Sequence, residues 1–342
     1  MIVCTCSFTD KGSLVEKKLS EFGSDFQILN KTQNQNLKQW VSNCFEKHLP
    51  LVFVGAVGIA VRTISPFVND KLSDSPVIVI DEKARYVIPV LSGHAGGANE
   101  LARFIAEKIG ALPVITTATD IENKFSVDVF AVKNGLKILN KEGIRIVSGK
   151  ILKGQRIRVW LEEGISFSNF NIPEEIEIVQ DKNAKSADVC IFLYSPSEKL
   201  PASSLYLKAK PFCLGMGCKK GKSFEELRDF IQTFLPENIR ENICSVSSIN
   251  LKKNEIGLNV LSQYLHVPFI TYSKEELEKA VLMEGSFSES DFVKETTGIS
   301  NVCERSAVLS SGNNTSLTVK KVSRDGMTLS VCERKIILDN WR

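Results

Sequence analysis

The sequence predicts a multi-domain α/β protein: N-terminal and C-terminal α/β modules with mostly parallel sheets, joined by a small middle α/β region. Short apolar runs alternate with segments of helical periodicity, and glycine-marked loops follow several of these runs. The length of 342 residues also exceeds what one hydrophobic core usually serves. We expect a domain with the glycine loops over 1–120, a middle region over 121–205 and a C-terminal domain over 206–342.

The first domain is expected to open with a strand over 2–8 and helices over 11–22 and 36–48. Further strands are predicted over 51–55, 77–81, 86–91 and 113–116, with a polar turn at 82–84. The segment 98–109 has Leu101, Ala102 and Ile105 at helical spacing, and Gly110 follows as a stop signal. Because strands alternate with helices, we expect the strands to be mostly parallel.

The middle region is predicted to contain a helix over 127–139 and strands near 144–147, 156–161 and 187–194. It carries no catalytic motif. In the last third we expect a strand over 211–215, a loop over 215–221, a strand over 268–271 and a helix over 300–310. Ser223 with Glu226, and Ser273 with Glu276, each form a capping-box pattern that opens a helix. Segments 316–323 and 327–334 alternate around Arg-Asp-Gly and predict a closing β-hairpin.

The composition is that of an ordinary globular protein, with 43% apolar and 24% charged residues. A net charge of +3 is too small to argue for nucleic acid, and no apolar run is long enough to span a bilayer. The N-terminus is typical of a strand rather than a signal peptide. The nine cysteines are scattered and form no CxxC pair, so we expect reduced, mostly buried thiols, no zinc site and a cytoplasmic location.

A GxxG turn, Gly55 to Gly58, connects an expected strand to an expected helix. Such a turn lets backbone N–H groups approach a ligand closely, although ordinary strand-to-helix turns share the pattern. Neither GxGxxG nor GxxxxGK[ST] occurs, which argues against nucleotide binding. Arg62 lies two helical turns along, and two roles are open for it. It either pairs with a substrate carboxylate or is a solvated surface residue.

The second loop, Ser92 to Glu100, has three glycines in five positions and one of the three histidines of the chain. Such a run is unfavourable unless the backbone takes unusual angles or approaches something closely. His94 then lies where a proton acceptor and an oxyanion pocket can coexist, near a helix N-terminus. The alternative is a tight turn whose histidine bonds to a backbone carbonyl. We favour the functional interpretation.

Polar residues also follow the predicted strand at 113–116. Thr117 and Asp120 fit either the rim of a ligand crevice or a helix cap. Further along, five lysines surround the loop that contains Gly215, Gly217, Lys219 and Lys220. This loop is either an anion-attracting patch beside a helix N-terminus or a solvated basic loop. Glu304 and Ser306 lie either on a helix surface or in the same pocket.

Five segments together resemble the cobalt-precorrin-5A hydrolase family of anaerobic cobalamin biosynthesis, the CbiG type. They are GAVGIAVR (55–62), LSGHAGGANELA (91–102), PVITTATD (113–120), LGMGCKKG (214–221) and VCERSAVLSSG (302–312). The resemblance spans nearly the whole chain and is most specific in the N-terminal block. The C-terminal block also resembles a module found as a separate protein in corrin synthesis.

The resemblance implies a cobalt-containing corrinoid substrate with a δ-lactone. In this family water opens the lactone, and a two-carbon fragment leaves as acetaldehyde to give cobalt-precorrin-5B. No cofactor is implied, since cobalt is carried by the substrate. The implied partners are this small molecule and either a second copy of the chain or, transiently, other corrin-pathway enzymes, with no nucleic acid or membrane. A non-catalytic tetrapyrrole-binding carrier is the alternative, and a methyltransferase is a weaker one.

On this basis we expect His94, Glu100 and Asp120 to be the catalytic candidates, with His94 as general base or acid. The residues expected to bind substrate are Gly55, Gly58, Arg62, Ser92, Gly93, Gly96, Gly97, Asn99, Thr117, Gly215, Gly217, Lys219 and Lys220. Backbone N–H groups of Gly93, Gly96 and Gly97 would stabilise an oxyanion. No metal site is expected. This interpretation requires the two glycine loops of the first domain to meet at one cavity.

Overall fold

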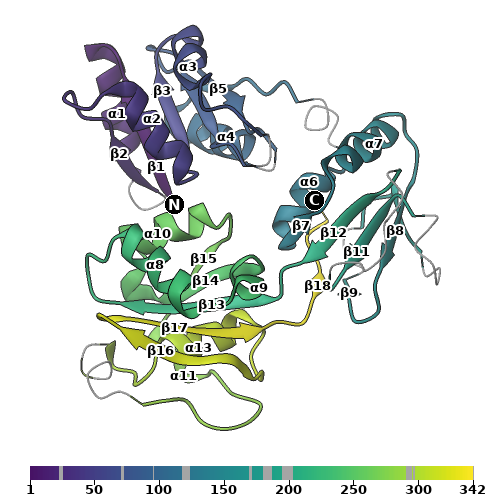
Figure 1. The fold of residues 1–342 in the computed structure, drawn as a ribbon. Coiled ribbons are helices and arrows are strands. Elements are labelled where there is room, and N and C mark those ends of the chain that lie inside the picture. The colour runs from purple at the N-terminus through teal and green to yellow at the C-terminus, as the bar shows by residue number, and fades with distance from the viewer. Residues whose placement is uncertain are drawn as a thin grey trace. The chain divides into compact units, whose positions relative to one another are not determined.

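The computed structural model describes residues 1–22, 26–70, 73–94, 96–117, 124–168, 172–179, 187–194, 203–289, 295 and 297–341. They form two compact units, Met1–Asn123 and Lys124–Arg342. Each unit mixes helices with mostly parallel strands, so the predicted α/β class is confirmed (Figure 1).

The first unit is built on one six-stranded sheet. In spatial order its strands are β2 (Gln27–Asn30), β1 (Ile2–Ser7), β3 (Leu51–Val54), β4 (Val77–Ile80), β5 (Tyr86–Leu91) and β6 (Leu112–Pro113). β2, β1, β3 and β4 are parallel. The chain starts at β1, moves to β2 and returns past β1 to β3. The sheet therefore has a switch point between β1 and β3, a place where α/β proteins often bind ligands.

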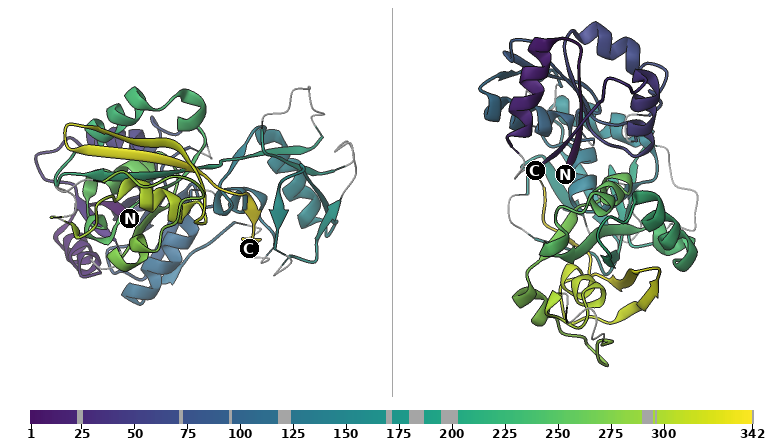
Figure 2. Two further views of the ribbon diagram at one scale, coloured as in Figure 1. Left: turned by 90° about the horizontal axis from the view of Figure 1, so that it is seen from below. Right: turned by 90° about the vertical axis from the view of Figure 1, so that its left-hand side faces the viewer.

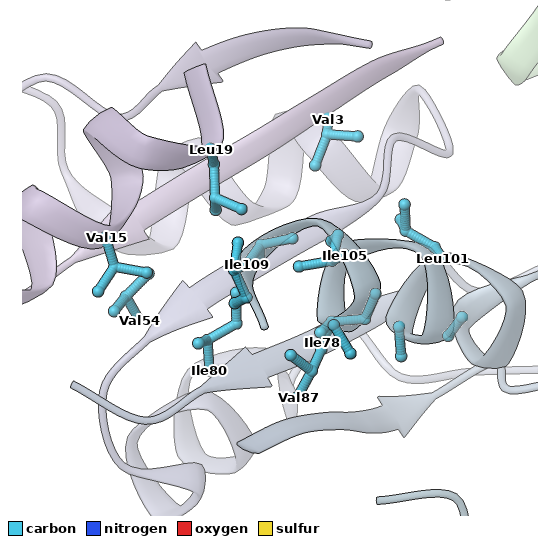
Figure 3. Packing of buried hydrophobic residues seen from close by; sticks show 14 of the residues in the cluster. Val3, Val15, Leu19, Val54, Ile78, Ile80, Val87, Leu101, Ile105 and Ile109 are labelled. Atoms are coloured by element: carbon cyan, nitrogen blue, oxygen red, sulfur yellow. The ribbon is translucent and has the colours of Figure 1, made fainter. Parts of the chain in front are cut away.

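In the described part of this unit, the helices beside the sheet are α1 (Asp10–Ser20), α2 (Leu37–Glu46), α3 (Val57–Ile64) and α4 (Ala98–Ile109). Apolar side chains of α1 and α4, such as Leu19 and Ile105, meet Ile78 and Ile80 of the central strands in one buried cluster (Figure 3). α4 ends at Gly110, whose φ of +72° is the left-handed conformation that glycine adopts readily. The stop predicted at this glycine is confirmed.

β4 and β5 are the antiparallel pair of this mostly parallel sheet, and the polar turn predicted at 82–84 connects them. β4 and β5 form an antiparallel hairpin, in which Val77 pairs with Leu91 and Ile80 pairs with Val87. Asp81 holds the turn, because its carboxylate accepts the N–H groups of Arg85 and Tyr86, both at 2.7 Å. A parallel connection needs a crossover of a dozen or more residues, and the segment 81–85 is too short for one.

The second unit begins with a smaller five-stranded sheet. Its spatial order is β10 (Ile176–Val179), β8 (Ile157–Leu161), β11 (Val189–Phe192), β12 (Leu205–Ala209) and β7 (Leu136–Ile138). Helices α6 (Val127–Lys133) and α7 (Lys141–Leu152) contact strands of this sheet. The helix predicted over 127–139 is too long, since the chain turns at Gly135, where φ is +64°, and enters β7. The strand predicted near 144–147 is wrong, because this segment lies within α7.

A second five-stranded sheet forms the rest of this unit. Its spatial order is β15 (Phe269–Tyr272), β14 (Ile243–Ile249), β13 (Phe212–Cys218), β17 (Met327–Glu333) and β16 (Leu317–Arg324). β13, β14 and β15 are parallel, and β17 is antiparallel to β13. Figures 1 and 2 show the yellow hairpin β16–β17 lying along β13. The hairpin predicted around residues 324–326 is confirmed.

Several helices pack beside this sheet. They are α8 (Phe224–Phe234), α9 (Glu237–Arg240), α10 (Ile256–Tyr264), α11 (Lys274–Glu278), α13 (Cys303–Ser310) and a 3-10 turn, η1 (Asn250–Lys252). Both predicted capping boxes are formed, at the starts of α8 and α11. α8 and α10 lie on one side of the sheet, and α11 and α13 lie on the other (Figure 1).

The C-terminal tail connects the two sheets of the second unit. Arg334 donates to the Asn134 carbonyl at 2.7 Å, and Asn134 in turn donates to the Asn340 carbonyl at 2.8 Å. The short strand β18 (Ile337–Leu338) pairs in parallel with β9 (Ser166–Phe167). All nine cysteines are free, and Cys218 is the one that is not buried.

Candidate functional site

The histidine loop is a tight turn between β5 and α4. Ser92 begins it with φ +56°, and its hydroxyl donates to the Asp74 carbonyl at 2.8 Å. The N–H groups of Ala98 and Asn99 donate to the carbonyls of Ser92 and Gly93, at 3.1 and 2.9 Å. These bonds join the first turn of α4 to the start of the loop. His94 lies between them and is half-buried, so its side chain reaches solvent.

Each of the three glycines in this turn is required for a different structural reason. A Cβ on Gly93 would lie 2.7 Å from the Asn99 Oδ1, and one on Gly96 would lie 2.5 Å from the Ser92 Cβ. Gly97 has φ +82° and forms the N-terminal cap of α4. The expectation of unusual angles or close approach is thus confirmed at this loop. The Gly97 N–H already donates to the His94 carbonyl at 2.8 Å, so Gly93 and Gly96 remain the candidates for binding an oxyanion.

Asn99 joins the histidine loop to the segment that follows β6. Its side chain is 2% exposed, and its Nδ2 donates to the Thr117 Oγ1 at 3.0 Å. The structure therefore brings the segments 92–99 and 113–117 together. Burial makes Asn99 a residue that holds the loop in place rather than one that contacts substrate directly. Glu100 is exposed in the first turn of α4. Asp120 lies outside the described residues.

The first glycine loop lies at the opposite end of the strands from the histidine loop. Gly55 follows β3, and its N–H donates to the Ile80 carbonyl at the end of β4. Ser92 instead follows Leu91, which pairs with Val77 at the start of β4. The two loops therefore follow opposite ends of β4, whose first and last residues are three steps apart, roughly 10 Å at about 3.3 Å per residue. The expected shared cavity for the two loops is therefore wrong, and the antiparallel β5 is the reason.

The GxxG turn lies at the carboxyl end of β3, at the switch point between β1 and β3. Gly55 contacts the Phe8 ring, where an added Cβ would come within 3.1 Å of the Phe8 Cδ2, and Gly58 is exposed in the first turn of α3. Arg62 is also exposed, and its Nη1 lies 3.5 Å from the Gly58 carbonyl on the same helix. Gly55, Gly58 and Arg62 thus lie together but apart from His94.

The second unit contains a cavity of about 480 Å³, within the range typical of small-molecule sites. It lies at the carboxyl ends of β13 and β14. Gly217, Lys219 and Lys220, which the sequence analysis named as substrate-binding candidates, are among the residues that line it. Gly215 does not, because it is buried in β13 against α13, where an added Cβ would lie 1.9 Å from the Cys303 carbonyl oxygen. The loop expected over 215–221 is shorter, since β13 continues to Cys218.

Sequence reasoning missed six other polar residues of this cavity: Ser248, Lys252, Thr297, Lys321, Ser323 and Thr328. Lys252 forms a salt bridge with Glu255 at 3.0 Å. Lys321 belongs to β16 and is half-buried, whereas its neighbour Lys320 is exposed. The pairing of β16 with β17 shifts register between Val319 and Val322, so alternation along 316–323 does not predict which lysine meets the cavity.

Two cysteine side chains also line the cavity. Burial raises the pKa of Cys218 to about 11, and burial likewise raises the pKa of Cys303 to about 11. Both thiols are therefore protonated at neutral pH and are poor nucleophiles. Among the described residues, no group of three or more His, Cys, Asp or Glu side chains is placed to hold a metal ion.

Glu304 and Ser306 lie neither on the helix surface nor in the cavity, which were the two roles considered from sequence. Glu304 is 2% exposed, and its Oε2 accepts from the Asn301 Nδ2 at 2.6 Å and the Ser288 N–H at 2.8 Å. Its Oε1 accepts the Lys321 N–H at 2.9 Å. Ser306 is fully buried and donates to the Cys303 carbonyl at 3.2 Å. Both residues fix the packing of α13 behind the cavity.

In the described part of the chain, no helix is long and apolar enough to cross a membrane. Residues 39–120 match the family described as Cobalamin synthesis G N-terminal, and residues 212–332 match Cobalamin synthesis G C-terminus. Both glycine loops of the first unit fall in the first match, and much of the cavity lining falls in the second.

Named relatives align over most of the chain. The cobalt-precorrin-5A hydrolase of Salmonella typhimurium is 33% identical over 295 residues, covering 84% of this chain and 82% of its own length. The cobalt-precorrin-5A hydrolase of Priestia megaterium is 31% identical over 335 residues, covering 94% and 85%. A solved cobalamin biosynthesis protein G homolog from Sulfolobus solfataricus is 25% identical, with a TM-score of 0.41 over 97% of this chain and 96% of that chain.

Proposed function

Because this chain belongs to the cobalt-precorrin-5A hydrolase family of cobalamin biosynthesis, we propose that it opens the δ-lactone of cobalt-precorrin-5A and releases acetaldehyde. The product is cobalt-precorrin-5B. The observation that carries this proposal is the likeness, over more than four fifths of the chain, to two relatives that are named for this substrate. Cobalt is part of the substrate in this reaction, and the proposal needs no further cofactor.

In the proposed reaction, water adds to the lactone carbonyl and the ring C–O bond breaks. This leaves a carboxylic acid and a hydroxyl group on the two-carbon fragment. A base then removes the hydroxyl proton, the C–C bond to the macrocycle breaks, and the electron pair passes to the tetrapyrrole. Acetaldehyde leaves, so one water is consumed for each acetaldehyde formed.

His94 is the proposed base for both proton transfers. It is half-buried in a turn that Asn99 and Ser92 hold rigid, and imidazole titrates near neutral pH. A positioned general base contributes about 10² to 10⁴ in rate. The N–H groups of Gly93 and Gly96 are the proposed donors to the oxyanion of lactone opening, each supplying roughly 3 kcal/mol.

The test is an anaerobic assay of acetaldehyde with purified protein and cobalt-precorrin-5A. We expect His94→Asn to lower kcat by about 10² to 10⁴. His266→Asn is the matched control. It is an exposed histidine whose φ of +52° asparagine tolerates, and it should leave kcat unchanged.

Two outcomes would change the proposal in different ways. A folded His94→Asn variant with near-normal turnover removes His94 from the mechanism. Wild-type protein that binds cobalt-precorrin-5A but releases no acetaldehyde contradicts the proposed reaction. That second result would favour a tetrapyrrole carrier.

A further inference from the structure

The cavity of the second unit lies where the strand order of its sheet reverses. The chain moves from β13 to β14 and β15 on one side, and it returns on the other side of β13 as β16 and β17. Gly217 and Cys218 at the end of β13, and Ser248 and Ile249 at the end of β14, line the cavity. Carboxyl ends of parallel strands at such a switch point are the usual ligand position in open α/β sheets.

The walls of this cavity are largely apolar. Ile249 and Val302 contribute side chains, and the lysines contribute their aliphatic stems. The stem of Lys219 crosses close above Gly326, where an added Cβ would lie 2.7 Å from the Lys219 Cδ. The Lys219 N–H also donates to the Gly326 carbonyl at 2.8 Å, so the loop after β13 is held against the hairpin turn. An apolar surface with charged groups on its stems suits a flat ligand with acidic arms.

The positive charge of this cavity is only partly compensated. Four lysines line it: Lys219, Lys220, Lys252 and Lys321. Lys252 pairs with Glu255, whereas the structure shows no salt bridge from the other three to any carboxylate among the residues it describes. Clustered cations without acidic partners attract anions and raise their local concentration.

Buried contacts fix the backbone from which Lys321 projects. The Lys321 N–H donates to the Glu304 Oε1 at 2.9 Å. Glu304 is itself fixed by Asn301 and Ser288 and is 2% exposed. A buried acceptor with these partners fixes the backbone of β16 at the register shift between Val319 and Val322, where Lys321 lines the cavity and Lys320 is exposed.

We propose that this cavity receives an acidic edge of the corrinoid, with Lys219 and Lys321 pairing with substrate carboxylates. This inference rests on the proposed function and deepens it, because it assigns Lys321 a role in binding the acidic substrate. The apolar walls contact the face of the ring. The cavity is smaller than a whole macrocycle with its acidic arms, so the rest of the substrate extends beyond it.

The test uses the full-length protein and uroporphyrin, a stable porphyrin with eight carboxylates, as the probe. Binding is followed by the change in porphyrin fluorescence at low salt. We expect the double variant Lys219→Gln/Lys321→Gln to raise Kd at least about tenfold, since each lysine donates a charge-assisted hydrogen bond. Lys320→Gln is the matched control on the same strand, and it should keep Kd within about twofold.

The inference would be overturned by no saturable uroporphyrin binding by the wild type, by an unchanged Kd in the double variant, or by equal weakening in Lys320→Gln. Coproporphyrin, with four carboxylates, should bind more weakly than uroporphyrin, and equal affinity would contradict carboxylate recognition. In the acetaldehyde assay the double variant should raise KM and retain kcat. Wild-type protein with lysine-dependent porphyrin binding but no acetaldehyde release would reject the proposed function and keep the site.

Discussion

Cys218 illustrates how strongly the pKa of a side chain depends on its surroundings. It is the half-buried cysteine of the chain, beside Lys219, and its position on the cavity wall first suggests a nucleophile. Burial raises its pKa to about 11, with Glu255 adding to this effect and Lys252 opposing it. The protonated thiol is therefore the dominant form throughout the physiological pH range.

This raised pKa predicts the pH dependence of alkylation. At pH 9 about 1% of Cys218 is thiolate, whereas a free cysteine with a pKa near 8.5 is mostly ionised. We expect the rate of iodoacetamide modification of Cys218 to rise about tenfold per pH unit from pH 7 to 10. Peptide mass spectrometry measures the rate, and the same protein in urea is the control. A rate that levels off near pH 9 in the folded protein would contradict the shift.

At the residue scale, the sequence was informative about residues whose type is required by the backbone conformation. The cluster Gly93, Gly96 and Gly97 predicted close approach or unusual angles, and the structure has both. The sequence was uninformative about residues whose surroundings depend on how distant strands pair. Lys321 resembles any lysine on an exposed strand, and only the position of β16 and β17 along β13 turns it toward the cavity.

At the scale of elements, most helices and strands follow from periodicity, but direction does not. Both β4 and β5 were predicted, with a polar turn between them, but the sequence expectation named only a mostly parallel sheet. The short connection makes this pair antiparallel. The segment 144–147 misled for a different reason. Its β-branched residues favour a strand, but Ile144, Val147 and Ile151 recur at helical spacing and are the buried face of α7.

The packing of α13 on β13 yields a prediction at this scale. Gly215→Ala would place a methyl group 1.9 Å from the Cys303 carbonyl oxygen, a backbone atom that cannot move without shifting α13. We expect a loss of about 1–3 kcal/mol or more in the free energy of unfolding, as for other overpacked cores. Urea denaturation measures it.

Gly149→Ala is the control for this substitution. Gly149 lies in α7, with nothing within 4 Å of an added Cβ. Alanine should therefore stabilise the helix by about 0.5–1 kcal/mol. If Gly215→Ala proved as stable as the wild type, the described contact between α13 and β13 would be wrong.

At the scale of the whole molecule, the chain is divided after Asn123 into two units. The first contains a complete sheet with its own buried cluster from α1, α4 and the central strands. The sequence-based boundary near 120 is close to this division. The boundary expected near 205 falls within the second unit and stays a prediction, since the tail that follows β17 connects both sheets there.

The first unit should fold without the second. We expect a fragment of residues 1–123 to show mixed α/β circular dichroism and one cooperative urea transition, with a free energy of unfolding of about 5 kcal/mol or more. The full-length protein is the reference. A fragment that is unfolded at zero denaturant, or that unfolds without cooperativity, would show that its core depends on the remaining residues.

The absence of a side chain at Gly215 has a consequence for ligand choice. It lets main-chain atoms of α13 rest directly on β13, so backbone atoms set the spacing of the helix and the sheet at this point. The hairpin tip contributes Gly326 to the lining, where a φ of +74° and the Lys219 stem leave no room for a side chain, while Arg324 and Asp325 beside it are exposed. Any attempt to re-engineer this protein for a larger or smaller anion should therefore vary the exposed tip residues and leave Gly326 and the helix side intact.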